Sequence, residues 1–229
     1  MRESLARIGR ATRERVARLS PFHARRRRFN LHLQDKWQGR AEQAVELWLR
    51  SADRLAGAHP LSVGDLGCGN ERVRDLLASR LGDDFTYQGY DLQPQSREAI
   101  KLDVRRGLPD REFDVVFALG LLEYLPDLED FLARLRRICI FAILSYSVFD
   151  SAEPLGEPER ETRGWRTHYT RGQLEALSER AGWVAEDFVL VDRGRTGVWL
   201  WRSVGPTGPQ RDSAVRLSLG ESPIGGRQP

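Results

Sequence analysis

Apolar and polar residues follow a regular pattern along the chain. From residue 61 onward, segments with the pattern of a strand alternate with segments with the pattern of a helix. Short apolar runs indicate strands, and an apolar residue at every third or fourth position indicates a helix. We expect strands at 61–67, 85–91, 99–104, 113–119, 138–146, 183–191 and 197–202, and helices at 71–81, 127–137 and 170–183. Alternation of this kind builds a parallel sheet covered on both faces, so the pattern predicts an α/β fold.

The last predicted helix carries its own start and stop signals. Thr170 and Gln173 have the spacing of a capping box, and Gly182 is a typical residue just past a helix end. The two strands after it are joined by a short turn at 192–197, so we expect them to pair antiparallel at one edge of the sheet.

Both ends of the chain depart from this rhythm. Residues 1–19 have apolar positions near helical spacing with arginines between them, and a further helix is expected at about 40–56. After residue 203, Gly, Pro, Ser and Arg dominate without periodicity, which is typical of a disordered tail. We therefore predict a basic helical arm at 1–56, one domain at 57–203 and a tail at 204–229.

Charge is distributed unevenly along the 229 residues. The first 40 contain twelve basic and three acidic residues, a net charge of +9, whereas the whole chain is only +3. The other 189 residues therefore sum to −6, and the basic character belongs to an arm on a mildly acidic body. Such an arm could act as a lid over the domain, or could contact a phosphorylated substrate, nucleic acid or an anionic membrane surface.

Composition excludes several classes of protein. No apolar run is long enough for a transmembrane helix, and the charged N-terminus does not read as a secretory signal. The two cysteines, Cys68 and Cys139, form neither a disulfide framework nor a metal cluster, and they suit a cytoplasmic protein without a metal.

A glycine-containing loop follows the first predicted strand, in the sequence LSVGDLGCGN. Ligands of open α/β sheets bind where such a loop turns into a helix, and Gly67 and Gly69 allow a ligand to approach the backbone. A dinucleotide fingerprint needs a third glycine, which is absent, and Glu71 would repel a pyrophosphate. Asp65, just before the glycines, suits a cofactor that carries cationic groups instead.

Two more acids stand at the ends of the next two strands. Asp91 closes the strand at 85–91, a position from which a carboxylate can accept hydrogen bonds from both ribose hydroxyls. Asp103 closes the following strand and could accept a hydrogen bond from an adenine amino group. Together with Asp65 and the glycines, these acids predict an adenosine-containing cofactor.

At these motifs the sequence resembles the small-molecule branch of the class I S-adenosylmethionine-dependent methyltransferases. The first motif of that family is similar to VGDLGCGNERVRDLL, its ribose-binding acid to YQGYDL and its adenine segment to KLDV. The fourth strand and helix are similar to FDVVFALGLLEYLPDLEDFLARLRR, and a late helix to HYTRGQLEALSERAGW. The resemblance covers about residues 57–202 and implies a doubly wound seven-stranded sheet whose last strand is antiparallel.

The resemblance also implies S-adenosyl-L-methionine as the cofactor and assigns roles around it. The loop Gly67–Cys68–Gly69 and Asp65 would surround its amino-acid part, and Asp91 its ribose. The remaining cofactor-binding positions would be Leu92, Asp103 and Val104 near the adenosine, and Ala118 and Leu119 under the methionine end. Glu71 stands where the family usually has a small residue.

Candidate acceptor residues lie in segments that would surround the methyl group. His168, in the loop at 148–170, could act as a general base for an acceptor hydroxyl or could pin the loop to the next helix. The other candidates are Trp37, Arg40, Glu123 and Tyr146, of which Glu123 could equally anchor its own helix and Tyr146 ranks behind His168.

The function expected from these features is methylation of a small-molecule or carrier-linked acceptor, at oxygen. The segment ALGLLEYL lacks the Asn/Asp-Pro-Pro-aromatic motif typical of enzymes that methylate nucleic-acid bases at amino groups. Three alternatives stay open at this point: an RNA or protein acceptor bound through the basic arm, a non-catalytic binding protein, and a dehydrogenase. The oligomeric state is open as well.

Overall fold

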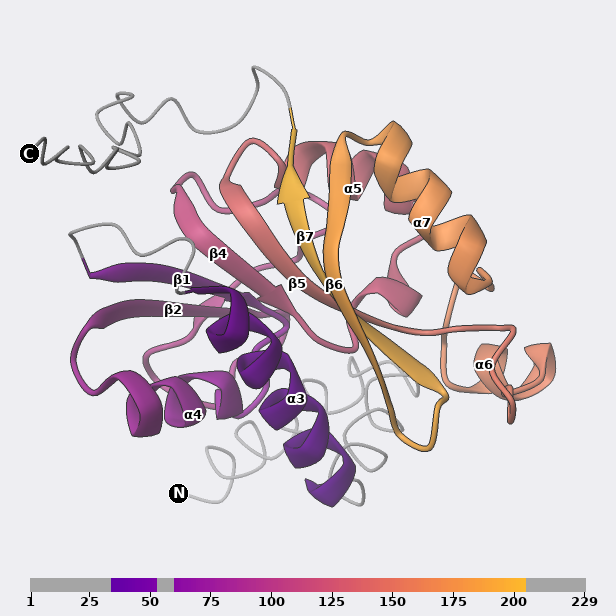
Figure 1. Cartoon of the computed structure of the whole chain (residues 1–229), viewed down its shortest axis with the longest axis horizontal. Helices are drawn as coiled ribbons and strands as arrows, with labels where there is room; N and C mark the ends of the chain where they lie inside the picture. The colour runs from indigo at the N-terminus through magenta and orange to yellow at the C-terminus, as the bar shows by residue number, and fades with distance from the viewer. Residues whose placement is uncertain (1–33, 53–59, 205–229) are drawn as a thin grey trace, which may run out of the picture.

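The computed structural model describes residues 34–52 and 60–204, so most of the predicted arm and the tail lie outside the described residues. One sheet occupies the centre, with helices on both of its faces (Figure 1). The predicted doubly wound α/β fold is confirmed.

The sheet contains seven strands in the order β3-β2-β1-β4-β5-β7-β6. Strands β1 to β5 are parallel to one another, and β7 pairs antiparallel with both β5 and β6, which confirms the predicted antiparallel pair. The strands are β1 (Leu61–Leu66), β2 (Phe85–Asp91), β3 (Ile100–Lys101), β4 (Phe113–Ala118), β5 (Cys139–Ser147), β6 (Trp183–Val191) and β7 (Thr196–Ser203). Strand β3 is shorter than expected because the chain turns at Asp103, whose carbonyl accepts a hydrogen bond from the Arg106 N–H.

The helices lie near their predicted positions with two differences. They are α3 (Gln34–Ala52), α4 (Arg72–Leu81), the 3₁₀ helix η1 (Leu122–Tyr124), α5 (Leu128–Leu135), α6 (Glu157–Thr162) and α7 (Arg171–Arg180). Helix α3 begins at Gln34 rather than near residue 40, and the short polar helix α6 was not expected from the periodicity. The predicted capping box of α7 is present, with Thr170 and Gln173 bonded reciprocally.

Each face of the sheet has its own apolar core. Helices α5 and α7 cover one face, where β4 contributes Val116 and Ala118. Helices α3 and α4 cover the other, where β4 contributes Val115 and Phe117. Alternation of buried side chains between the two faces is the reason that β4 and β5 read as continuous apolar runs.

The start of α3 is fixed to the carboxyl end of β4 by close packing. Trp37 lies directly on the backbone of Gly120, where an added Cβ would stand 2.1 Å from the ring. Arg40, one turn later, lies with its guanidinium 4.4 Å from the Trp37 ring centroid and forms an ion pair with Asp192 in the β6–β7 turn. Helix α3 is therefore part of the folded domain.

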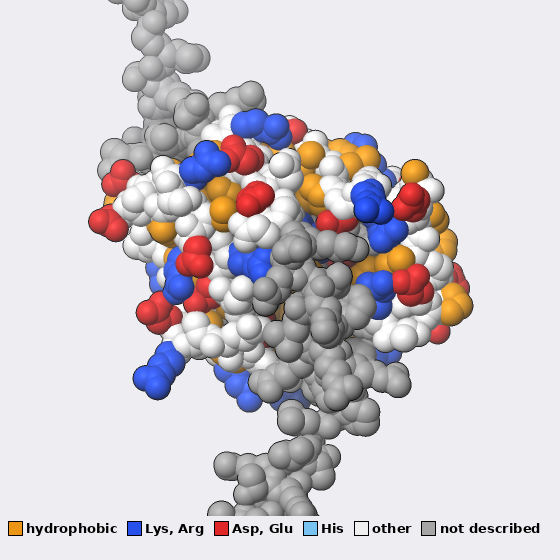
Figure 2. All heavy atoms as spheres, turned by 90° about the horizontal axis from the view of Figure 1, so that it is seen from below, with side chains coloured by type: hydrophobic (Ala, Val, Ile, Leu, Met, Phe, Trp, Pro, Cys, Tyr) orange, Lys and Arg blue, Asp and Glu red, His pale blue; other side chains and the backbone are white. Residues whose placement is uncertain are grey.

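Charged side chains of both signs are interspersed over the described surface. Figure 2 shows acidic and basic groups side by side on one face, and fourteen ion pairs join described residues. Among the described residues, no helix is both long and apolar enough to cross a membrane.

Replacement of Gly120 by alanine should destabilise the domain. The new methyl group would overlap Trp37, and Gly120 also has a positive φ of 62°, which side chains disfavour. Overpacking combined with backbone strain costs about 1–3 kcal/mol. Urea unfolding measures the change in the free energy of unfolding.

Gly107→Ala is the matched control, because nothing lies within 4 Å of an added Cβ there. If both variants unfold at the same urea concentration, Trp37 does not constrain this turn.

Candidate functional site

The loop between β1 and α4 exposes its backbone at the carboxyl edge of the sheet. Gly67 and Gly69 have φ of 78° and 55°, so both need the left-handed conformation that glycine adopts without strain. An added Cβ at Gly69 would meet nothing within 4 Å, whereas one at Gly67 would touch Leu121. The structure therefore leaves open space directly in front of Gly69.

Asp91 stands beside this opening at the end of β2. Its Oδ2 accepts a hydrogen bond from the Gly69 N–H at 3.1 Å, and its Oδ1 accepts one from the Gln93 N–H at 2.7 Å. The side chain is partly exposed, and each oxygen keeps a lone pair for a further donor. A carboxylate oriented in this way can accept hydrogen bonds from two neighbouring hydroxyl groups.

Asp103 is engaged differently from Asp91. Arg105 binds both carboxylate oxygens, at 2.7 and 2.6 Å, and this ion pair lowers the pKa of Asp103. The carboxylate therefore stays ionised, and a ligand would have to share it with Arg105. Val104, the next residue, is buried in the core that α5 covers.

Asp65 lies below the glycine loop rather than in the opening. Its side chain on β1 is buried, and its carboxylate accepts a hydrogen bond of 2.8 Å from the Tyr87 hydroxyl. Burial, with smaller contributions from the negative charges of Asp91 and Glu71, raises the pKa of Asp65 to about 7. The thiol of Cys68 is also buried here, and its pKa is raised by burial and by the nearby acids.

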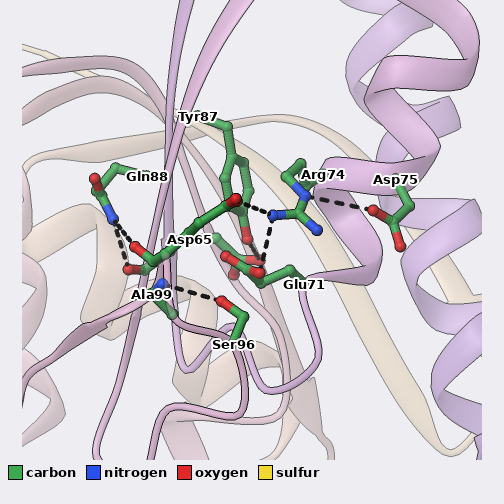
Figure 3. A network of polar contacts seen from close by, with 10 residues as sticks. Asp65, Glu71, Arg74, Asp75, Tyr87, Gln88, Ser96 and Ala99 are labelled. Carbon is green, nitrogen blue, oxygen red and sulfur yellow. Dashed lines mark hydrogen bonds and ion pairs between the residues drawn. The ribbon is translucent and has the colours of Figure 1, made fainter.

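Glu71 stands where the family that the sequence resembles usually has a small residue, and its backbone adopts the conformation that glycine favours. Its φ of 59° is left-handed, and its side chain is buried and bonded to Arg74, with 3.0 Å between Oε2 and Nη1 (Figure 3). Its Oε1 fills the space that Gly89 leaves on β2, 2.9 Å from where a Cβ would stand. Glu71 is thus packed against β2.

Glu123 of η1 is buried at the carboxyl edge of β4 and β5. Its Oε1 accepts a hydrogen bond of 2.9 Å from the Ser147 N–H, and its carbonyl accepts one of 2.6 Å from the Arg166 N–H. Burial raises its pKa, and the Arg40 guanidinium opposes this rise.

Tyr146 uses the hydrogen-bonding capacity of its hydroxyl within the protein. It donates to Thr167 at 3.0 Å and accepts from the Tyr169 N–H at 3.0 Å and from Arg160 at 3.3 Å. Because this leaves no capacity for an acceptor molecule, the geometry favours a structural role for Tyr146.

His168 accepts a hydrogen bond at Nδ1 from the Nε–H of Arg160, at 3.0 Å. Arginine always carries its proton, so the proton of a neutral His168 is on Nε2, which then donates rather than accepts. The structure therefore does not favour the general-base role expected for His168. Together with Glu161, Gly164, Trp165 and Arg166, this side chain lines an open pocket of about 440 Å³.

Trp37 and Arg40, predicted as acceptor contacts, reach this edge from α3. Trp37 covers Gly120, and Arg40 Nη2 donates to Asp192 and, at 3.3 Å, to Thr196. The structure thus brings the glycine loop, Asp91, Ala118, Leu119 and Glu123 to one edge of the sheet and places Trp37 and Arg40 against it.

Comparison with known proteins finds a matching family for part of the chain. Residues 64–140, from β1 to the start of β5, match the model of a family described as a methyltransferase domain. Over these residues the chain is similar to methyltransferase domains, which supports the resemblance to the class I S-adenosylmethionine-dependent methyltransferases. A search of curated protein sequences finds no match to it.

Solved structures share the fold of this domain at low sequence identity. A magnesium protoporphyrin IX methyltransferase from Synechocystis PCC 6803 has a TM-score of 0.56 at 16% identity, with 75% of this chain and 85% of that chain covered. A S-adenosylmethionine-dependent methyltransferase from Clostridium acetobutylicum scores 0.54 at 11% identity, covering 72% and 92%. The mitomycin 7-O-methyltransferase scores 0.52 at 15% identity, covering 81% and 69%.

The domain also contains polar residues that its sequence did not identify as candidates. Arg160 is fully buried, although the sequence EPERET around it is polar throughout, and it bonds to the Ser147 carbonyl at 2.8 Å. Ser147 is equally buried at the end of β5. The only local signal for Arg160 is its position in a helix too polar to pack by itself.

Asp65→Asn should weaken the pH dependence of folding stability. The unfolded chain releases this proton near the ordinary pKa of 3.8, whereas the folded protein releases it near pH 7. The wild type therefore loses stability as the pH rises between these values and loses no more above them. Asparagine keeps an acceptor for Tyr87 but does not titrate. At about pH 8 the free energy of unfolding of the variant should therefore exceed that of the wild type by on the order of a few kcal/mol.

Urea unfolding at a series of pH values measures this difference, with Asp110→Asn as an exposed control. If the free energy of unfolding depends on pH in the same way in the wild type and in the Asp65 variant, the raised pKa of Asp65 is wrong.

Proposed function

We propose that the chain is an enzyme that transfers a methyl group from S-adenosylmethionine to an oxygen atom of a small-molecule or carrier-linked acceptor. One arrangement carries this proposal: the open space before Gly69, with the Asp91 carboxylate held 3.1 Å from its N–H. This arrangement lies inside the segment that matches a methyltransferase domain.

The residues at the carboxyl edge fit this cofactor. Asp91 has free lone pairs for the two ribose hydroxyls, and Gly67 and Gly69 leave room for the amino-acid part. Asp65 would act on this part from beneath the loop, because Tyr87 and the loop cover it. The other residues that would hold the cofactor are Cys68, Leu92, Asp103, Val104, Ala118 and Leu119.

When bound, S-adenosylmethionine supplies a methyl group that its sulfonium makes electrophilic. The protein then has to align the acceptor oxygen and to exclude water. Trp37, packed on Gly120, closes this part of the edge on the α3 side. The loop that contains Trp165 and His168 provides a pocket wall on the other side.

Two observations support a small-molecule acceptor. After β4 the chain reads LGLLEY, without the motif typical of enzymes that methylate the amino groups of bases. The fold neighbours include a mitomycin 7-O-methyltransferase. The buried, unpaired cysteines suit a reducing compartment, and we propose a cytoplasmic location.

Asp91→Ala should abolish binding of S-adenosylhomocysteine, the product form of the cofactor. The variant loses the acceptor for both ribose hydroxyls and also releases the Gly69 N–H. Loss of charged hydrogen bonds of this kind weakens binding by at least about tenfold. Calorimetric titration of the wild type, of Asp91→Ala and of the exposed control Asp110→Ala measures the effect.

Binding by the wild type and the control, with loss in Asp91→Ala, supports the proposal. Absence of binding by the wild type would overturn it and would favour a non-catalytic binding protein.

An RNA or protein acceptor is the second candidate, because the first 40 residues carry a net charge of +9. The face shown in Figure 2 carries charges of both signs, so on this face affinity for RNA would depend on the arm. RNA binding that weakens steeply with salt and disappears on deletion of residues 1–30 would support this candidate. Failure to bind RNA at low salt would exclude RNA as the acceptor.

A further inference from the structure

Three buried polar atoms without a hydrogen-bond partner gather at the carboxyl end of β5. They are Oε2 of Glu123, Oγ of Ser147 and Nη1 of Arg160, and none has a partner within the described part of the chain. These residues come from η1, β5 and α6, which are far apart in the sequence. Buried polar atoms are nearly always paired in folded proteins, so a cluster of three needs a physical reason.

The backbone of Ser147 brings these atoms together. Its N–H donates to Glu123 Oε1 at 2.9 Å, and its C=O accepts from Arg160 Nη2 at 2.8 Å. The two charged side chains therefore flank the same residue, each with its second polar atom free. No direct ion pair within 4.0 Å joins Glu123 to Arg160 among the described residues, so each of the two side chains keeps one polar atom available for a further partner.

The free atoms have complementary chemistry. Arg160 Nη1 can only donate, an ionised Glu123 Oε2 can only accept, and Ser147 Oγ can do either. A hydroxyl group donates one hydrogen bond and accepts up to two, so it satisfies both charged side chains at once. An ether oxygen or a carboxylate would leave Glu123 without a donor.

The cluster lies at the carboxyl edge of the sheet, the edge that also carries the glycine loop and Asp91. Glu123 follows closely after Leu119 and Gly120, and the Gly120 N–H is bonded to Ser145 on β5 at 2.8 Å. The walls of the open pocket touch both charged residues, since Arg166 donates to the Glu123 carbonyl and Trp165 lies 4.8 Å from the Arg160 guanidinium.

We propose that Glu123 and Arg160 bind the hydroxyl group of the acceptor, and that Glu123 is the general base of the methyl transfer. This inference rests on the proposed function. As the oxygen–methyl bond forms and the sulfur–methyl bond breaks, the sulfur leaves as a neutral thioether and the hydroxyl proton passes to Glu123 Oε2. Arg160 Nη1 donates to the oxygen and stabilises its developing negative charge.

The surroundings of Glu123 support its role as a base. The charged or titratable groups that face it are Arg40 from α3, Tyr146 from β5 and Arg160 from α6. Burial raises its pKa despite both arginines, which makes it a stronger proton acceptor than an exposed carboxylate.

The test uses two pairs of probes that differ only in the hydroxyl proton: phenol and anisole, and cyclohexanol and its methyl ether. Binding is measured by ligand-observed NMR on the wild type without cofactor. Each alcohol should bind about tenfold more tightly than its ether, because the ether cannot donate to Glu123.

Glu123→Gln should remove this preference. The amide oxygen can still accept from the Ser147 N–H, but the amide nitrogen then stands where Oε2 accepted and donates instead. Alcohol binding should weaken by about tenfold while ether binding is retained. Ser147→Ala removes only an unpaired hydroxyl and should weaken alcohol binding without unfolding the domain, which circular dichroism checks.

Glu179→Gln is the matched control, an exposed glutamate on α7. Equal binding of alcohols and ethers by the wild type, no binding of either pair, or an unchanged preference in folded Glu123→Gln would each overturn the proposal. The titration with S-adenosylhomocysteine tests the proposed function independently of this inference. If S-adenosylhomocysteine binds and the alcohols do not, the inference alone fails, whereas absence of cofactor binding removes the proposed function beneath it.

Discussion

The buried carboxylate of Glu123 is the contact on which the candidate site depends. It binds the Ser147 N–H at the end of β5, while its own carbonyl holds the Arg166 N–H in the loop before α7. A charged group is costly to bury unless hydrogen bonds and opposite charges compensate for the lost water. Here the arginines of α3 and α6 supply the opposite charges, which oppose the rise that burial causes in the pKa of Glu123.

Two glycines create space for large side chains of other elements. Gly120 lets the Trp37 ring lie on the backbone after β4, and Gly89 makes room on β2 for the carboxylate of Glu71. In each case the missing Cβ belongs to one element and the filling side chain to another. Close contact between two elements, rather than turn geometry alone, is therefore the reason that a glycine stands at each of these positions.

The sequence predicted the fold well because its signals are local. Apolar runs marked the strands, and Thr170 with Gln173 marked the start of α7. That Gly67, Gly69 and Asp91 lie together was predictable too, since they stand at strand ends, and strand ends meet at one edge of a parallel sheet. Helix α6 was missed because its six residues are polar and have no apolar period.

The acceptor side was much less predictable, for a physical reason. Arg160 is buried only because Tyr146, Phe149 and Trp165 surround it, and these residues are brought together by tertiary packing. The orientation of His168 likewise follows from the Arg160 hydrogen bond at Nδ1. Neither fact leaves a pattern in the neighbouring sequence, so the nature of the candidate base could be judged only from the structure.

The position of β7 has a consequence for how the chain is made. This strand lies between β5 and β6, although it follows both of them in the described part of the chain. During synthesis on the ribosome, β1 to β5 can assemble while the free edge of β5 still waits for a partner. Until β7 leaves the exit tunnel, that apolar edge is open to unwanted pairing, and a chain arrested just after β6 would expose it permanently.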